Sequence, residues 1–209
     1  CRRAKPRTIY RFTSSGLALY SKIKFKADEY CRKEYRRKKE NFKMSYQNVR
    51  AYFEREGIAD HITEHDSTAD TVEHAARTVG CSPAEIAKSL SFSAGGKPIV
   101  IVAAGDSRIN SSKFKSYFHQ KPVMIPAEQV EILIGHAPGG VCPFAVKEGV
   151  EVYLDISLRR FSVIYTAAGK DTATVRLTIP ELERYARAKG WVDVCKGWIS
   201  GENENPVLS

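Results

Sequence analysis

The chain has 209 residues, of which 43% are hydrophobic and 10% aromatic. This composition supports one ordinary domain with a buried core and excludes a fibrous or wholly disordered chain. The longest apolar run covers residues 99–104, which is much too short to span a membrane. The first residues lack the apolar segment of a secretory signal, so we expect neither a signal peptide nor a membrane anchor.

The net charge of +9 is distributed very unevenly. Residues 1–43 carry 15 Lys/Arg against 4 Asp/Glu, a net charge of +11, whereas residues 44–209 carry 18 against 20, a net charge of −2. We therefore predict a basic extension over 1–43 and a mildly acidic domain over 44–209. Because Met44 is the first methionine, we interpret the extension as a solvated arm or as non-native sequence. The alternative is an arm that contacts the phosphate backbone of nucleic acid.

Residue spacing predicts a series of short elements in the first half of the chain. A basic helix is expected near 17–43 and a second helix over 46–56. Start and stop signals and apolar patterning then predict the following elements: a strand at 61–65, a helix capped by Asp70–Glu73 and ended by Gly80, a helix start at Ser82-Pro83, and a hairpin of strands at 88–92 and 98–105.

The second half of the chain has more strands than helices. The expected elements are a helix capped by Asn110, a helix over 126–134 closed by Gly135, strands at 150–155, 161–167 and 174–179, a helix at 180–188, and an extended segment at 191–194. Helices and strands do not alternate strictly. We therefore predict a mixed α/β (α+β) domain with a largely antiparallel central sheet flanked by helices, and not a dinucleotide-binding fold.

The cysteines and histidines do not form a metal-binding pattern. The five cysteines contain no C-x-x-C pair and are odd in number, which excludes a disulfide framework and fits a reducing cytoplasm. Only His61 and His65 are four residues apart, and they lie in a predicted strand where that spacing separates them widely. We expect no metal.

The most unusual segment is the loop GHAPGGVCPF at 135–144. Its glycines allow backbone conformations that other residues avoid, and its prolines stiffen it. Such a loop can direct backbone groups at a ligand or an oxyanion, although a plain connecting loop has the same composition.

Two side chains could carry chemistry. Lys88 enters a strand from a capped turn in apolar surroundings. It is either an exposed charge at a strand edge or a cation directed into a cleft. Cys142 lies six residues after His136, so it is either a nucleophile or a small buried side chain.

Residues 44–209 resemble the YbaK/prolyl-tRNA synthetase-associated domain family, and most closely its EbsC-like branch. The strings that carry the resemblance are EHDSTADTVEHAARTVG, IAKSL, IVAAGD, GHAPGGVCPF, EVYLDISLRRF, VIYTAAG and WVDVCKGW. The resemblance implies a trans-acting aminoacyl-tRNA deacylase that binds the acceptor 3′ end, without cofactor or metal, with an aminoacyl-tRNA synthetase as a partner. A non-catalytic module that binds a tRNA 3′ end or a small nucleotide is the alternative.

The resemblance also assigns the site residues. It gives Lys88 and Gly140 the catalytic roles, and assigns substrate binding to Ser89, His65 and the remainder of the loop: Gly139, Val141, Cys142 and Pro143. Cysteine-selective members have polar side chains at two positions where a rough alignment places Ala167 and Thr174, so the amino acid removed is left open. An activated ester needs positioning more than a strong nucleophile, which is consistent with the absence of a hydrolase triad.

Overall fold

The computed structural model describes residues 33, 36–37, 40–41, 43–66, 68 and 71–198. The chain divides into two compact units, Cys1–Glu40 and Asn41–Ser209. The sheet and the helices that cover it belong to the second unit. Most of the basic helix predicted at 17–43 lies outside the described residues, and the domain boundary at Met44 stays a prediction.

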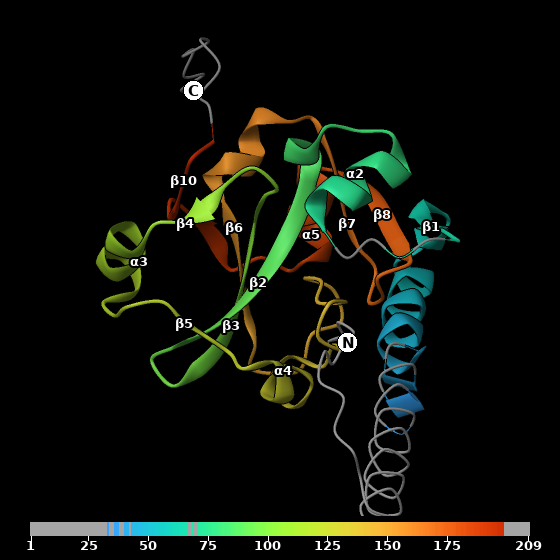
Figure 1. The fold of residues 1–209 in the computed structure, drawn as a ribbon, viewed down its shortest axis with the longest axis horizontal. Helices are drawn as coiled ribbons and strands as arrows, with labels where there is room; N and C mark the ends of the chain where they lie inside the picture. Colours follow the sequence, from blue (N-terminus) through green and yellow to red (C-terminus); the bar gives the residue numbers. More distant parts are fainter. Residues whose placement is uncertain are drawn as a thin grey trace, which may run out of the picture. The chain divides into compact units, whose positions relative to one another are not determined.

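The core of the second unit is an eight-stranded mixed sheet with the order β1-β8-β7-β2-β3-β6-β9 and with β5 paired to β2 (Figure 1). Neighbours β2 and β3 form an antiparallel hairpin, whereas β2 runs parallel to β7 and β3 runs parallel to β6. The strands are β1 (Ile62–Glu64), β2 (Ile86–Ala94), β3 (Lys97–Ala104), β5 (Val123–Met124), β6 (Glu151–Asp155), β7 (Val163–Ala167), β8 (Ala173–Thr178) and β9 (Gly190–Val192), and a separate pair joins β4 (Arg108–Ile109) to β10 (Cys195–Lys196). The predicted mixed α/β architecture is confirmed.

Helices begin and end largely where the sequence signals lie. They are the helix at 43–56, α2 (Val72–Val79), α3 (Ser111–Phe118), α4 (Ala127–Ile134) and α5 (Ile179–Tyr185), with 3₁₀ turns η1 (Ala59–His61), η2 (Pro83–Glu85) and η3 (Ile156–Arg160). As predicted, the Asn110 side chain caps α3, and Gly80 and Gly135 end α2 and α4 in the left-handed conformation.

Two predicted helix starts differ from the structure. Helix α2 is capped by Thr71, whose hydroxyl accepts a hydrogen bond from the His74 N–H at 3.1 Å. Asp70 lies outside the described residues. Ser82 and Glu85 do form a capping box, but it starts only the 3₁₀ turn η2, after which the chain enters β2. Pairing of Ala87 with both β3 and β7, and of Ile86 with β7, outweighs the local helix signal.

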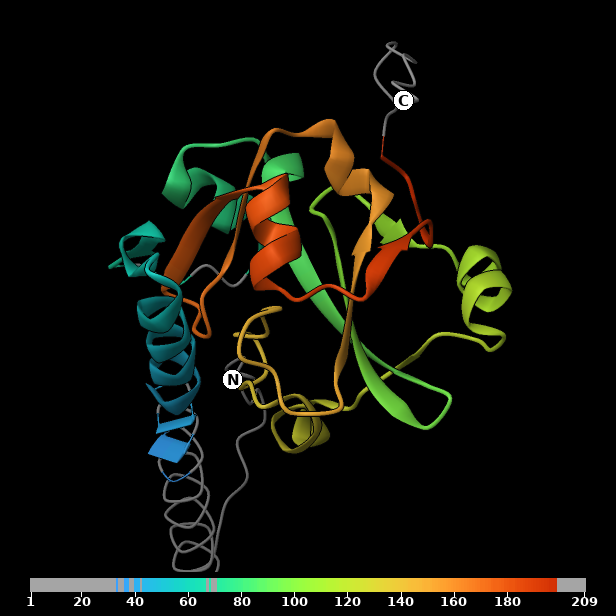
Figure 2. The ribbon, with the colours of Figure 1, turned by 180° about the vertical axis from the view of Figure 1, so that it is seen from behind.

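The two faces of β3 separate two apolar cores, as the alternation of strand side chains requires. Val100 and Val102 face the core that contains the helix at 43–56, α4 and α5, where the rings of Phe53 and Phe144 lie 4.7 Å apart. Ile99 and Ile101 face the core that contains α3. Figure 2, which views the domain from the side opposite to that of Figure 1, shows α5 in front of the sheet. No helix in the described part of the chain is long and apolar enough to cross a membrane.

Candidate active site

A cavity of about 290 Å³ opens beside the centre of the sheet, where β2 and β7 separate. These two parallel strands pair only through Ile86 and Ala87 of β2, so the chain beyond Ala87 leaves a gap. Lys88 and Ser89 point to opposite faces of the sheet, as neighbouring residues of a strand do. Both can still border the gap, because no strand lies beside them there. The other walls come from α2, the β7–β8 hairpin and the loop at 139–141.

Lys88 is held at this gap by backbone carbonyl groups. Its Nζ donates to the carbonyl oxygen of Gly105 at 3.0 Å and to that of Ser107. Gly105 has no space for a side chain, since an added Cβ would lie 2.0 Å from the Pro83 carbonyl oxygen. This close approach of two backbone segments sets the position of the carbonyl that holds Lys88.

The Lys88 ammonium group is half-buried. Burial lowers its pKa from the ordinary lysine value, while the nearby Asp106 carboxylate acts in the opposite direction. Arg160 already engages Asp106 through two hydrogen bonds, at 2.7 and 3.0 Å. The result is a poorly solvated cation, bonded to neutral carbonyl groups, beside a cavity that can admit an anionic or carbonyl group.

Two hydroxyl groups at the cavity have unused hydrogen-bonding capacity. Ser89 Oγ and Thr166 Oγ1 are buried and have no hydrogen-bond partner among the described residues, and both residues line the cavity. A buried polar group without a partner costs about 1–3 kcal/mol. A ligand with its own donors or acceptors would recover this cost, so the pair indicates a polar ligand.

The loop at 135–144 is anchored by His136, which is fully buried. Its Nε2 lies 2.8 Å from the Phe144 carbonyl oxygen and its Nδ1 lies 2.7 Å from Ser45 Oγ. Because a carbonyl can only accept, Nε2 donates the proton and Nδ1 accepts from the serine hydroxyl. Burial lowers the pKa of His136, which favours this neutral form. The histidine thus ties the loop to the helix at 43–56.

Only part of the loop reaches the cavity. Gly139 (φ 93°) and Val141 line it, whereas Gly140 is buried and its N–H donates to the Ala137 carbonyl oxygen at 2.9 Å. Pro143 is buried and lines a different cavity. Cys142 is fully buried, and burial raises the pKa of its thiol to about 12.

His65 does not line the cavity but contacts a residue that does. Its Nε2 is 2.7 Å from Oγ1 of Thr174, which lines the cavity. The structure therefore brings Lys88, Ser89, Gly139 and Val141 together directly.

Several wall residues were not identified as site residues from the sequence. For Thr166 and Lys170, the sequence shows only that they lie on or just after a predicted strand. Ala167 and Thr174 are indicated only by the rough alignment with cysteine-selective family members. The Lys170 ammonium lies 3.9 Å from the centroid of the Tyr46 ring and pairs with Glu64. Within the described part of the chain, no group of three or more acidic, histidine or cysteine side chains could hold a metal ion.

Comparison with known proteins gives consistent results. Residues 66–185 match the model of the aminoacyl-tRNA editing domain. The uncharacterized protein YwhH of Bacillus subtilis is 42% identical over 156 residues, which cover 74% of this chain and 99% of YwhH. A proline–tRNA ligase of Bacillus licheniformis is 26% identical over 107 residues, which cover 51% of this chain and 19% of that enzyme.

A solved structure agrees in fold. A protein described as a proposed trans-editing enzyme for prolyl tRNA synthetase aligns with a TM-score of 0.66 and 27% identity, over 73% of this chain and 98% of that chain. The family model alone covers more than half of the sequence, and the region it matches includes Lys88 and the loop at 135–144. The chain therefore belongs to the aminoacyl-tRNA editing domain family and is an aminoacyl-tRNA deacylase.

Proposed function

We propose that the cavity between β2 and β7 is the deacylation site, and that it receives the esterified amino acid at the 3′ end of a mischarged tRNA. The observation that carries this proposal is one small cavity that combines a half-buried lysine with two hydroxyl groups that have no partner in the described part of the chain. A volume of about 290 Å³ suits an amino acid with part of a ribose.

In this proposal Lys88 acts on the ester as a fixed positive charge. Hydrolysis of the ester passes through a tetrahedral intermediate whose former carbonyl oxygen becomes negative. An ammonium group held by the Gly105 and Ser107 carbonyls needs little reorganisation to stabilise that charge. One well-placed donor of this kind lowers the activation free energy by about 3 kcal/mol.

The remaining groups position the substrate. Ser89 and Thr166 would bond the polar groups of the aminoacyl moiety, and the exposed backbone at Gly139 would lie against it. Gly140 would act indirectly, by closing the turn through its bond to Ala137. Cys142 would act only by packing behind the loop, because its buried thiol is far from the thiolate form.

The proposal is tested with a panel of tRNAs charged with non-cognate amino acids. We expect ester release from at least one of them to exceed the rate in buffer alone by orders of magnitude. The alternative function, a non-catalytic module for the tRNA 3′ end, predicts binding without release. Partnership with a synthetase is tested in the same assay, because a partner that delivers tRNA should lower the KM without changing kcat.

A further inference from the structure

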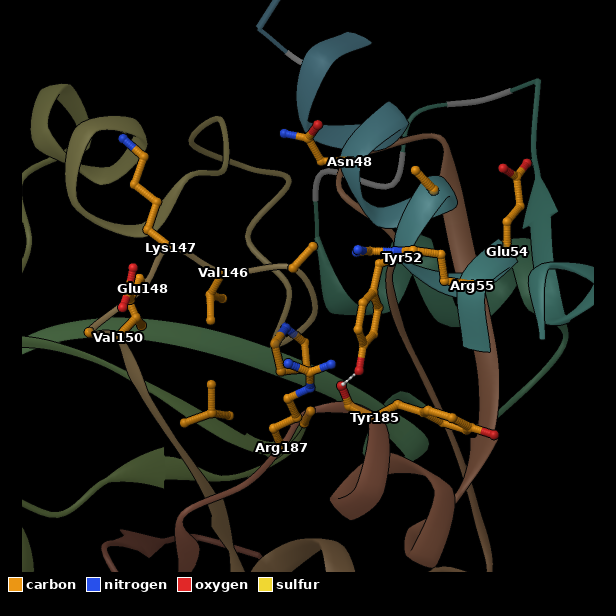
Figure 3. A pocket seen from close by; sticks show the side chains of 16 residues that line it. Asn48, Tyr52, Glu54, Arg55, Val146, Lys147, Glu148, Val150, Tyr185 and Arg187 are labelled. Atoms are coloured by element: carbon orange, nitrogen blue, oxygen red, sulfur yellow. Dashed lines mark hydrogen bonds between the residues drawn. The ribbon is translucent and has the colours of Figure 1, made fainter. Parts of the chain in front are cut away.

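A second and larger cavity, of about 1050 Å³, lies on the helix at 43–56 and shares no lining residue with the cavity at Lys88 (Figure 3). Its walls come from that helix, from the segment at 143–150 and from the residues that follow α5. The volume lies at the upper end of the range for small-molecule sites. The deacylation proposed above makes no use of it.

Two guanidinium groups of this cavity lie near the same aromatic ring. The Cζ atoms of Arg55 and Arg187 lie 6.0 and 5.3 Å from the centroid of the Tyr52 ring. The Tyr52 hydroxyl donates to the Tyr185 carbonyl oxygen at 2.9 Å, which fixes the ring, and Figure 3 shows this bond with the two arginines beside it. Both arginines therefore bring positive charge to the wall of the cavity that carries the Tyr52 ring, and such charge attracts an anion.

The neighbouring charged groups leave this pair available to a ligand. Glu54 pairs with Arg50 at 3.0 Å, and Figure 3 shows Glu54 and Glu148 on opposite sides of the cavity. The Lys147 ammonium donates to the Ile132 carbonyl oxygen at 2.8 Å. Arg187 forms an ion pair with Glu56 at 3.6 Å, but its side chain stays 76% exposed, so most of the guanidinium group is open to a ligand.

The backbone at Arg187 is the strongest sign of a function. The residue lies just past the end of α5 with φ 48°, where glycine would fit without strain. The Ala188 N–H closes the turn by donating to the Glu183 carbonyl oxygen at 3.2 Å. Ala145, with φ 50°, lines the same cavity. Strained residues are found at binding sites, and two of the three non-glycine residues with positive φ in the described part of the chain line this cavity.

We propose that this cavity binds a phosphate-bearing ligand of nucleotide size. Arg55 and Arg187 bind the phosphate, because guanidinium forks match the oxygens of phosphate in pairs. Val146, Val150 and Val152 offer an apolar wall to a sugar or base. The phosphate comes either from a free nucleotide or from the backbone of a nucleic acid, and the two sources are separated by experiment.

The test is titration calorimetry of the full chain with three probes: pyrophosphate, ATP and an uncharged tRNA acceptor minihelix. The variants are Arg187→Gly and Arg55→Gln. The control is Arg159→Gln, which removes an exposed arginine that stacks on Trp191 outside the cavity. We expect each cavity variant to weaken binding of at least one probe about tenfold, the loss of one charge-assisted contact, and the control to leave it unchanged.

Arg187→Gly also separates binding from folding. Because glycine relieves the strained φ, the variant should unfold at the same or a higher temperature than the wild type while it binds less tightly. Binding of pyrophosphate or ATP identifies a free nucleotide as the source, and binding of the minihelix alone identifies a nucleic-acid backbone. The proposal is overturned if no probe binds at millimolar concentration, or if both cavity variants bind as the wild type does. Neither result depends on deacylation.

Discussion

The two cavities of this domain differ in how they are built. The smaller cavity opens inside the sheet, where β2 and β7 separate. It contains a half-buried lysine and buried hydroxyl groups that have no partner among the residues the structure describes. The larger cavity lies between a helix and loops and contains arginines that keep their charge in any protein environment. The proposed ester chemistry uses one poorly solvated cation held by two carbonyl groups, whereas the proposed anion binding uses two exposed guanidinium groups. Size alone would favour the larger cavity, whereas the proposed chemistry favours the smaller one.

One loop connects the two regions. Gly139 and Val141 line the smaller cavity, while Pro143 and Ala145 line the larger one. His136 anchors this loop to the helix at 43–56, which also carries Tyr52 and Arg55. Substitutions on one side of the loop can therefore show whether the other side stays intact.

The largest effect is expected from Lys88→Ala. Loss of the ammonium group should lower kcat for ester release at least about 100-fold, the effect of removing one oxyanion-stabilising donor. Nucleotide binding in the larger cavity should be unaffected, so that calorimetry with ATP checks the fold of the variant. The matched control is Lys97→Ala, an exposed lysine on the adjacent strand. Full activity of Lys88→Ala would contradict the assignment of the catalytic cavity.

A smaller loss is expected from Gly139→Ala. Alanine at φ 93° is strained by about 1–2 kcal/mol, so the loop should shift and kcat/KM should fall about tenfold. Gly149→Ala is the matched control, since Gly149 has φ 85° and lines only the larger cavity. The comparison predicts that Gly149→Ala disturbs ATP binding and spares deacylation. Equal loss of deacylation in both variants would show that the two cavities are coupled through the loop.

Ser89→Ala should separate activity from stability. Because Ser89 Oγ has no partner among the described residues, its removal should leave the melting temperature unchanged or raise it. A hydrogen bond to the substrate would be lost, which predicts a rise in KM of about three- to tenfold. Ser93→Ala, further along the same strand and outside the cavity, is the control. A KM equal to that of the wild type would exclude Ser89 from substrate binding.

The fold was predictable where local signals agree with pairing in the sheet. The apolar run at 98–105 became β3 at the centre of the sheet, and Asn110 capped α3 as expected. The Ser82-Pro83 signal predicted a helix and gave only a 3₁₀ turn, because pairing of β2 with two other strands depends on residues far away in the chain. Two-residue strands such as β5 have no periodicity that a sequence could show.

The site was predictable only in part, for a related reason. Lys88 and the loop could be found from their unusual residues and from family resemblance. Thr166 could not, since its place at the cavity comes from the gap between β2 and β7 and not from its neighbours in sequence. The larger cavity could not be predicted from the sequence either, because its two arginines, Arg55 and Arg187, are more than 130 residues apart in the chain.

The smallest effect on activity is expected from Cys142→Ala, which tests the role of the loop's buried side. A thiol with its pKa raised to about 12 by complete burial is no nucleophile near neutral pH, so deacylation should stay within about twofold of the wild type. The cost should appear in stability, as a loss of about 1 kcal/mol from the packing beside Phe144. Kinetics and thermal unfolding of the same sample check both parts. If Cys142→Ala lost as much activity as Lys88→Ala at unchanged stability, the Cys142 thiol would have to take part in the reaction. The reaction would then involve the side of the loop that faces away from the small cavity.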